Sequence, residues 1–385
     1  LKKFGKLPRS DSKCAVLHEE LPAKVKVLFL SHRWFRPWLT QEACEQQGHI
    51  WAGEPHPDDA DGSKFALLIA GIESIAAQRD WALSEIAVWM DFACIDQDNL
   101  PLRLKGIRSL LGYMARCDTV IVPTLEKPPY AMVHRMIGGY GDRAWTRLEA
   151  FGFYVLSLLE GKTRPELFYS APGNQVQQLD YVLLPYTMPS TGVLTVEADR
   201  DHVQTHENTL LDVLHKSALA GSLAARGPAM VAAAGLGNSE RLTELLSQPD
   251  ISPDTQDNLG VTAMWSAARQ GHAKIVETLL KVRASQDLSA ASGQDPVHCA
   301  AQEGHKKVVE VLLSFRANLN KLDKKGFTPL LRATQNNHVE VVKLLLNAQP
   351  AESEAVREKA QELNFTEIVD LVSEFGEVRP PCCAI

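Results

Sequence analysis

The feature that most constrains this chain is a repeat of 33 residues in its second half. Four glycines keep that spacing: Gly227, Gly260, Gly293 and Gly326. Three histidines keep the same period: His272, His305 and His338. The text around them recurs as GVTAMWSAARQGHAKIVETLLK, GQDPVHCAAQEGHKKVVEVLLS and GFTPLLRATQNNHVEVVKLLLN. A fixed period of this length is typical of a solenoid, in which each unit packs against its neighbours.

Each repeat is expected to form two short helices joined by a turn that contains glycine. The small side chains of Ala267 and Ala268 predict close packing of the first helix against the next unit. The second helix carries an apolar stripe at helical spacing, formed by Ile275, Val276, Leu279 and Leu280. One repeat cannot bury this stripe alone, so we expect the repeats to stack.

These segments resemble the ankyrin repeat, whose motif is G-x-TPLH-x-AA-x-x-GH-x-x-VV-x-x-LL. The resemblance covers residues 227 to 350, with a degenerate first repeat at 227 to 259. Residues 351 to 375 resemble a truncated last repeat, and shortened, more polar ends suit the caps of a stack. The resemblance implies an all-α solenoid over residues 226–375 that binds a protein partner.

Histidines at fixed spacing raise the question of a metal site. One histidine per repeat at the same position favours a structural imidazole that bonds to turn backbone, so no metal is expected. His202 and His206 are four residues apart in DHVQTHE, which lacks the glutamate of the HExxH zinc pattern. For this pair we prefer a solvated helix face.

The first half of the chain alternates strand-like and helix-like segments. Apolar runs predict strands at 24–31, 86–92 and 118–123, with a weaker candidate at 181–185. Helical periodicity is found at 63–82, 103–117 and 143–161. This alternation predicts an α/β domain with a parallel sheet and helices on both faces. We assign it residues 24–225, after an extension at 1–23; a tail at 376–385 follows the repeats.

Polar side chains follow two of the predicted strands. The first strand ends in Ser31, His32, Arg33 and Trp34. The second leads into the acids and amides of residues 91–99. Because ligands gather at the carboxyl ends of parallel strands, we expect these groups to furnish one pocket.

Four segments resemble a TIR-like domain in their order and spacing: LFLSHRW, VWMDFACIDQD, GIRSLLGYMARCDTVIV and RAWTRLE. The second is especially similar to the fungal heterokaryon-incompatibility (HET) branch, with its W-x-D-x-x-C-I-x-Q-D signature. The resemblance covers residues 24 to 155 and implies a flavodoxin-like, TIR-like sheet.

Some TIR domains hydrolyse NAD+ at the nicotinamide–ribose bond, so the resemblance implies NAD+ as a substrate and no resident cofactor. The family's catalytic glutamate corresponds to Glu149 in WTRLE, although Thr146 stands where the family has cysteine and the usual phosphate-side loop is not recognisable. A carboxylate near the ribose stabilises the positive charge that develops as the bond breaks. The candidate substrate-binding residues are Ser31, Arg33, Trp34, Asp91, Asp96, Gln97, Arg143 and Trp145.

Each of these residues also has a structural interpretation. Glu149 could be a surface glutamate paired with Arg147 or Arg143. The polar group after the second strand could bond loop amides, and Arg33 with Trp34 could cover the sheet rim. Two other functions therefore stay open: a non-catalytic scaffold that self-associates through its TIR-like domain, and a protein whose repeats carry all of the function.

Composition and short motifs limit the possible partners and the cellular compartment. A net charge of −7 disfavours nucleic acid as a partner. Seven scattered cysteines without CxxC pairs predict reduced thiols and a cytoplasmic protein. The last residues, CCAI, fit a C-a-a-X motif with Cys382 as lipid acceptor. One prenyl chain would add only weak, reversible membrane association.

Overall fold

The computed structural model describes most of the second half of the chain and the regular elements of the first. The described residues are 21–30, 63–89, 109–123, 144–160, 167–170, 176–178, 188–192, 194, 199–290, 292–348 and 353–377. They belong to two compact units, residues 1–213 and 214–385. The division falls inside helix α7 (Arg200–Leu219), whereas the repeats and motifs of the sequence suggest a boundary after residue 225.

The first unit is built on a sheet with strand order β2-β1-β3-β4-β5. Four strands are parallel to their neighbours: β1 (Lys26–Leu30), β2 (Ile86–Trp89), β3 (Thr119–Pro123) and β4 (Leu167–Ser170). The short β5 (Gln177–Gln178) is antiparallel to β4. The predicted parallel sheet and its first three strands are confirmed. The sequence did not predict β4 and β5, and the candidate strand at 181–185 lies outside the described residues.

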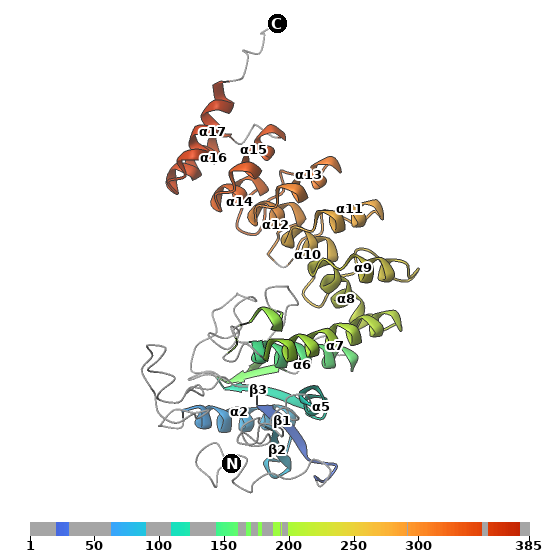
Figure 1. Cartoon of the computed structure of the whole chain (residues 1–385). Helices are drawn as coiled ribbons and strands as arrows, with labels where there is room; N and C mark the ends of the chain where they lie inside the picture. Colours follow the sequence, from blue (N-terminus) through green and yellow to red (C-terminus); the bar gives the residue numbers. More distant parts are fainter. Residues whose placement is uncertain are drawn as a thin grey trace. The chain divides into compact units, whose positions relative to one another are not determined.

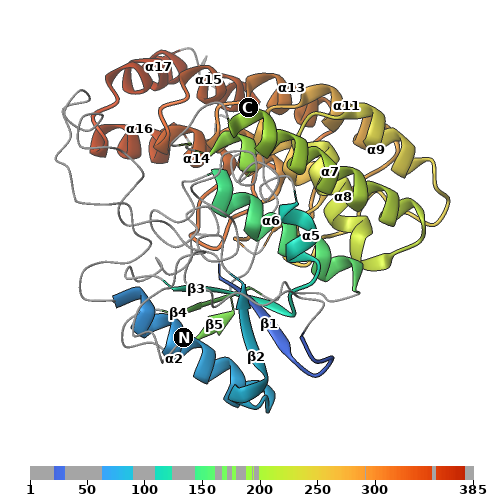
Figure 2. The ribbon, with the colours of Figure 1, turned by 60° about the horizontal axis from the view of Figure 1, so that its bottom comes forward.

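Helices cover both faces of this sheet, as the alternating pattern predicted. Because side chains alternate along a strand, Leu28 and Leu30 point to one face and Phe29 to the other. The first face packs against α2 (Ser63–Arg79), and the second against α5 (Leu110–Met114) and α6 (Ala144–Leu159). Figure 2 shows α2 on one side of the sheet and α5 and α6 on the other.

The second unit is a row of helix pairs (Figure 1). The inner helices are α8 (Leu223–Gly235), α10 (Ala263–Gln270), α12 (Pro296–Gln302), α14 (Pro329–Gln335) and α16 (Ser353–Glu362). Each is followed by an outer helix: α9 (Ser239–Leu246), α11 (Ala273–Lys281), α13 (Lys306–Ser314), α15 (Val339–Ala348) and α17 (Thr366–Glu377). The apolar stripe of α11 is buried, which confirms the predicted solenoid.

Hairpin turns project between successive pairs, and we call them fingers. The first finger is residues 252–262, the second 285–295 and the third 318–328. Each is closed by a backbone hydrogen bond across its turn: Asp257 N to Val261 O, Ala290 N to Gln294 O and Asp323 N to Phe327 O. The link from α15 to α16 is only residues 349–352, which is too short for another finger. The last pair occupies the segment for which the sequence predicts a truncated repeat.

The four glycines spaced by 33 residues have two different structural roles. Gly260, Gly293 and Gly326 lie in the finger turns with φ of 75°, 77° and 78°, a conformation that favours glycine. Gly227 lies instead inside α8 and is buried, so its place in the series of 33 is a coincidence. A Cβ atom at Gly227 would stand 2.0 Å from the carbonyl oxygen of Gln256 in the first finger.

We expect Gly227→Ala to lower the free energy of unfolding by about 1–3 kcal/mol, because backbone cannot yield as a side chain can. Helix propensity alone predicts the opposite, a gain of about 1 kcal/mol. Denaturant titration of the full chain measures the difference. Leu223→Ala in the same helix is the control, since Leu223 is 76% exposed. A Gly227→Ala protein as stable as the control would show that α8 does not approach the finger this closely.

Candidate functional site

Most of the residues predicted to form the nucleotide pocket lie outside the described residues. They are Ser31, Arg33, Trp34, Asp91, Asp96, Gln97 and Arg143. The proposed lipid acceptor Cys382 also lies outside. Their convergence at the edge of the sheet therefore stays a prediction from the sequence.

Two of the predicted residues, Trp145 and Glu149, lie on α6. They are four residues apart, so they share one face of the helix, and both are half-buried. The indole N–H of Trp145 donates a hydrogen bond of 3.3 Å to the Asp199 carboxylate at the start of α7. Thr146, in the position where the related motif has cysteine, is 3% exposed and belongs to the core. The structure thus places Glu149 near the start of a helix that packs on the sheet.

The neighbouring Arg147 ties α6 to the short helix η6 (Pro189–Thr191). Its guanidinium donates to the hydroxyl of Thr191 at 2.8 Å and to the carbonyl of Met188 at 3.4 Å. Ser190 of η6 bonds in turn to Glu207 of α7, through its N–H at 2.7 Å and its hydroxyl at 3.0 Å. No pattern in the sequence predicts this polar connection from α6 to α7.

Glu207 and its neighbour His206 correct one prediction. His206 is 8% exposed and Glu207 is 6% exposed, so this turn of α7 is buried and not solvated as expected. Burial raises the pKa of Glu207, although the hydrogen bonds from Ser190 oppose that shift. A buried carboxylate with two hydrogen-bond donors stabilises the packing of η6, and the sequence pattern of α7 alone could not show it.

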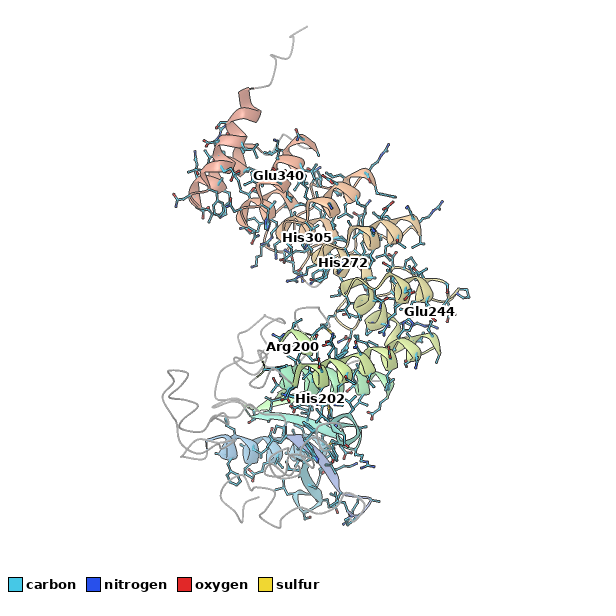
Figure 3. All side chains as sticks on the ribbon, in the orientation of Figure 1. Arg200, His202, Glu244, His272, His305 and Glu340 are labelled. Atoms are coloured by element: carbon cyan, nitrogen blue, oxygen red, sulfur yellow. The ribbon has the colours of Figure 1, made fainter. Side chains whose placement is uncertain are left out.

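The repeated histidines join neighbouring repeats. The imidazole Nε2–H of His272 donates to the carbonyl of Gly235 at 3.0 Å. His305 bonds to Arg269 O at 2.9 Å and His338 to Gln302 O at 2.8 Å. Figure 3 labels His272 and His305 on successive repeats. The structural interpretation of these histidines is confirmed, and the described residues contain no group of three or more potential metal ligands.

The fingers are tied to one another and form a continuous surface. Asp254 of the first finger accepts the N–H of Ser285 in the second at 2.7 Å. The Lys321 ammonium of the third finger donates to the carbonyl of Asp287 and to the hydroxyl of Ser289. The backbone N–H of Lys324 donates to Ser292 O at 3.2 Å. Because these bonds link the turns, the backbone of each finger is fixed relative to the next.

The tip of the third finger differs from the other two. Leu322 is 58% exposed, and the equivalent positions, 33 and 66 residues earlier, hold the polar Ser289 and Gln256. Lys324 and Lys325 beside it are also exposed. Within the part of the chain that the structure describes, neither ammonium has a carboxylate partner. The sequence analysis missed these residues, although comparing one finger position across the repeats would have singled out Leu322.

Two equivalent buried aspartates in the first and third fingers have different surroundings. Asp323 Oδ1 accepts the N–H groups of Lys325 and Phe327, and its Oδ2 accepts the Arg332 guanidinium. Asp257 Oδ1 likewise accepts the N–H groups of Leu259 and Val261, at 2.9 and 2.8 Å. Its Oδ2 is buried with no partner among the described residues.

The missing partner has a simple cause and an electrostatic consequence. The position that Arg332 fills is Ser266 in the repeat of Asp257, and the Ser266 hydroxyl is itself buried without a bond. Burial raises the pKa of Asp257 to about 6, although two backbone N–H groups oppose the shift. For Asp323 burial also acts to raise the pKa, but the bonds from Phe327, Arg332 and Lys325 outweigh it and the pKa is lowered.

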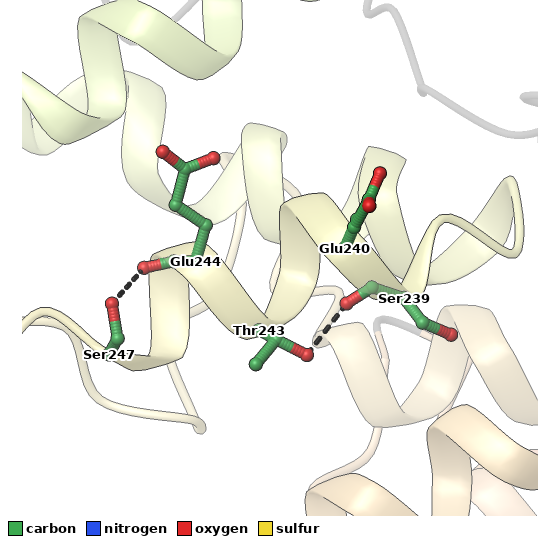
Figure 4. A pocket seen from close by; sticks show the side chains of 5 residues that line it. All are labelled: Ser239, Glu240, Thr243, Glu244 and Ser247. Carbon is green, nitrogen blue, oxygen red and sulfur yellow. Dashed lines mark hydrogen bonds between the residues drawn. The ribbon is translucent and has the colours of Figure 1, made fainter.

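A shallow hollow on the outer face of α9 carries no site of its own. Figure 4 shows its lining: Ser239, Glu240, Thr243, Glu244 and Ser247. The hydroxyl of Thr243 bonds to the carbonyl of Ser239, and the hydroxyl of Ser247 to the carbonyl of Glu244. The Glu244 carboxylate lies 2.8 Å from the imidazole of His215. These groups serve the helix itself, and the hollow is open.

Comparison with known proteins bears on the second unit. Residues 229–323 and 282–356 match a family model described as ankyrin repeats in three copies. No curated protein matches the chain. Ankyrin repeats are therefore present over residues 229–356. Among the described residues no helix is both long and apolar enough to cross a bilayer.

We expect Asp257→Asn to stabilise the fold at pH 8. The native pKa lies above the ordinary 3.8, so native Asp257 holds its proton more tightly, and the stability this gives is lost as pH rises from about 4 to 6. The loss is about 3 kcal/mol. Asparagine keeps the acceptor and loses the charge, but buries an amide at about 1–2 kcal/mol, which leaves a gain of about 1–2 kcal/mol.

Denaturant titration of wild type and variant at pH 8 and pH 4 measures this gain, which should vanish at the lower pH. Asp323→Asn is the matched control, because it removes the partner of Arg332 and should destabilise by at least about 1 kcal/mol at pH 8. Equal effects of the two substitutions on stability would show that the ion pair with Arg332 does not cause the difference between Asp257 and Asp323.

Proposed function

We propose that this protein is an intracellular adaptor whose ankyrin repeats bind a protein partner through the fingers and the adjoining inner helices. The observation that carries the proposal is the match of residues 229–356 to ankyrin repeats, together with fingers that are bonded into one surface. Ankyrin repeats generally bind proteins. A preorganised surface loses little conformational entropy on binding, which favours affinity.

The third finger indicates what that partner offers. An exposed apolar side chain beside two unpaired ammonium groups fits a surface that presents an apolar group among carboxylates. The chain as a whole has a net charge of −7, so this basic tip is a local exception. Among the described residues, Cys117 and Cys299 are free thiols, which supports a reducing compartment such as the cytoplasm.

For the first unit we propose a TIR/HET-like effector domain that hydrolyses NAD+. The strand order β2-β1-β3-β4 with parallel pairing supports the flavodoxin-like fold that the resemblance implies. Glu149 supports the chemistry, because a half-buried carboxylate can stabilise positive charge better than one in bulk water. The bond from ribose C1′ to nicotinamide breaks, its electron pair leaves with nicotinamide, and water adds to C1′ with loss of a proton.

The alternative for this unit is non-catalytic self-association. One observation favours it: Trp145 and Arg147, both within the motif, form hydrogen bonds to Asp199 and η6. Those bonds give the motif a structural role without any substrate. The two proposals differ in whether the Glu149 carboxylate matters for a chemical reaction or only for the fold.

The adaptor proposal is tested by substituting the third finger in the full chain. We expect the triple variant Leu322→Ser, Lys324→Glu, Lys325→Glu to lose most partners that proximity labelling recovers with wild type. The control is Lys274→Glu, Lys307→Glu, which makes the same change of charge on the exposed faces of α11 and α13. Recovery of the same proteins with all three forms would remove the fingers as the binding surface.

The enzymatic proposal is tested by following nicotinamide release from NAD+ at high protein concentration. We expect Glu149→Gln to reduce the rate by about 100-fold or more, because the charge that stabilises the transition state is gone while shape is kept. Circular dichroism and thermal unfolding confirm that the variant folds. If wild type and variant release nicotinamide at the same background rate, the enzymatic proposal is wrong. Sedimentation of the same samples then tests the alternative, self-association.

A further inference from the structure

Two outer helices are followed by an arginine in the left-handed backbone conformation, which disfavours residues other than glycine. Arg283, after α11, has φ of 63°. Its N–H bonds to Leu280 O at 3.0 Å, and the N–H of Ala284 bonds to Leu279 O at 2.9 Å. These are the two bonds of a Schellman motif, in which the residue with positive φ is usually glycine. An arginine here carries the steric cost of the left-handed region.

The next repeat has the same arrangement. Arg316, after α13, also has φ of 63°, and the N–H groups of Arg316 and Ala317 bond to Leu313 O and Leu312 O at 2.9 and 3.0 Å. Where the inner helices end, the solenoid uses glycine or asparagine in the left-handed conformation, the residues that tolerate it best. Gly237, Gly271 and Gly304 follow α8, α10 and α12, and Asn337 and Asn364 follow α14 and α16. The fold alone therefore gives no reason for arginine at the ends of α11 and α13.

Neither arginine is used inside the molecule. Both side chains are exposed, and among the described residues neither guanidinium has an ion pair or a hydrogen bond. The nearest carboxylate along α11, Glu277, is already paired with Lys281 at 2.7 Å. Each arginine directly follows an exposed apolar residue: Val282 is 45% and Phe315 40% exposed.

We propose that Val282, Arg283, Phe315 and Arg316 form a docking strip for an acidic segment of a protein partner, distinct from the fingers. Each guanidinium would take a carboxylate in bidentate geometry, and an apolar side chain of the partner would cover Val282 and Phe315. Arginine is one of the residue types enriched among those that contribute most of the binding energy in protein interfaces. The amide of Gln286 donates to Phe315 O at 2.8 Å and holds the two repeats in register along the strip.

Charge selects this occupant over other polyanions. Only two unpaired guanidinium groups lie in the strip, and the chain carries a net charge of −7, so nucleic acid and anionic membranes are repelled beyond the strip. A short acidic segment with an apolar residue matches both the charge and the exposed side chains. The proposal does not depend on the fingers or on the first unit.

The experiment selects short random peptides displayed on phage against the full chain, and compares retention on variants. Peptides with aspartate or glutamate on both sides of an apolar residue should be enriched. Their retention should fall about tenfold or more on Arg283→Gly, Arg316→Gly and on Val282→Ser, Phe315→Ser. The variant Arg283→Lys, Arg316→Lys should bind these peptides weakly, because lysine keeps the positive charge but cannot form the bidentate bond to a carboxylate.

The unfolding temperature distinguishes a binding role from a structural one, because replacing an arginine that stabilises the fold would lower that temperature. The double glycine variant should unfold at a temperature higher by about 2–4 °C for each arginine, while binding is lost. A lower unfolding temperature, equal retention of acidic peptides, or no acidic enrichment each overturns the proposal. So does strip-dependent binding of phosphatidylserine vesicles or of single-stranded DNA in place of peptide. Peptides sensitive only to the third-finger variant would support the adaptor proposal and remove the strip.

Discussion

The bond from each repeated histidine to a carbonyl of the preceding repeat sets the geometry on which the second unit depends. Room for the ring exists only because the facing residue is glycine: a Cβ atom on Gly271 would lie 2.8 Å from Nδ1 of His305. The same glycine supplies the left-handed turn between the two helices. One residue pair therefore fixes both the turn within a repeat and the distance to the next, and the register of the fingers follows from it.

The last helix pair shows what happens without that bond. Phe365 occupies the histidine position, since its N–H bonds to Ala360 O as that of His338 bonds to Ala333 O. A phenyl ring has no donor, and Asn337 replaces the facing glycine. The pair is held by buried apolar side chains such as Ile368 and Val372. In this pair, apolar packing takes the place of the directional bond that joins the earlier repeats.

Periodicity made the second unit predictable, because in a solenoid the contacts that decide the fold lie one period apart in sequence. It misled at Gly227, where the spacing of 33 fell on a helix that packs against finger backbone. It also could not distinguish Asp257 from Asp323, because their difference lies in Ser266 and Arg332 on the following helices. In the first unit, alternating apolar runs predicted the first three strands. The buried Glu207, however, is bonded to Ser190 of η6, and no local sequence pattern predicts that contact.

The motif around Glu149 illustrates how one helix can serve two purposes. Trp145 and Arg147 lie partly buried on α6 and bond to α7 and η6, which fixes the rotation of the helix about its axis. Fixing that rotation also fixes the direction in which the Glu149 side chain leaves the helix. Preorganisation of a carboxylate is what catalysis at a sugar would need. The structural bonds of the motif are therefore compatible with chemistry, and what separates the two roles is whether a nucleotide reaches the carboxylate.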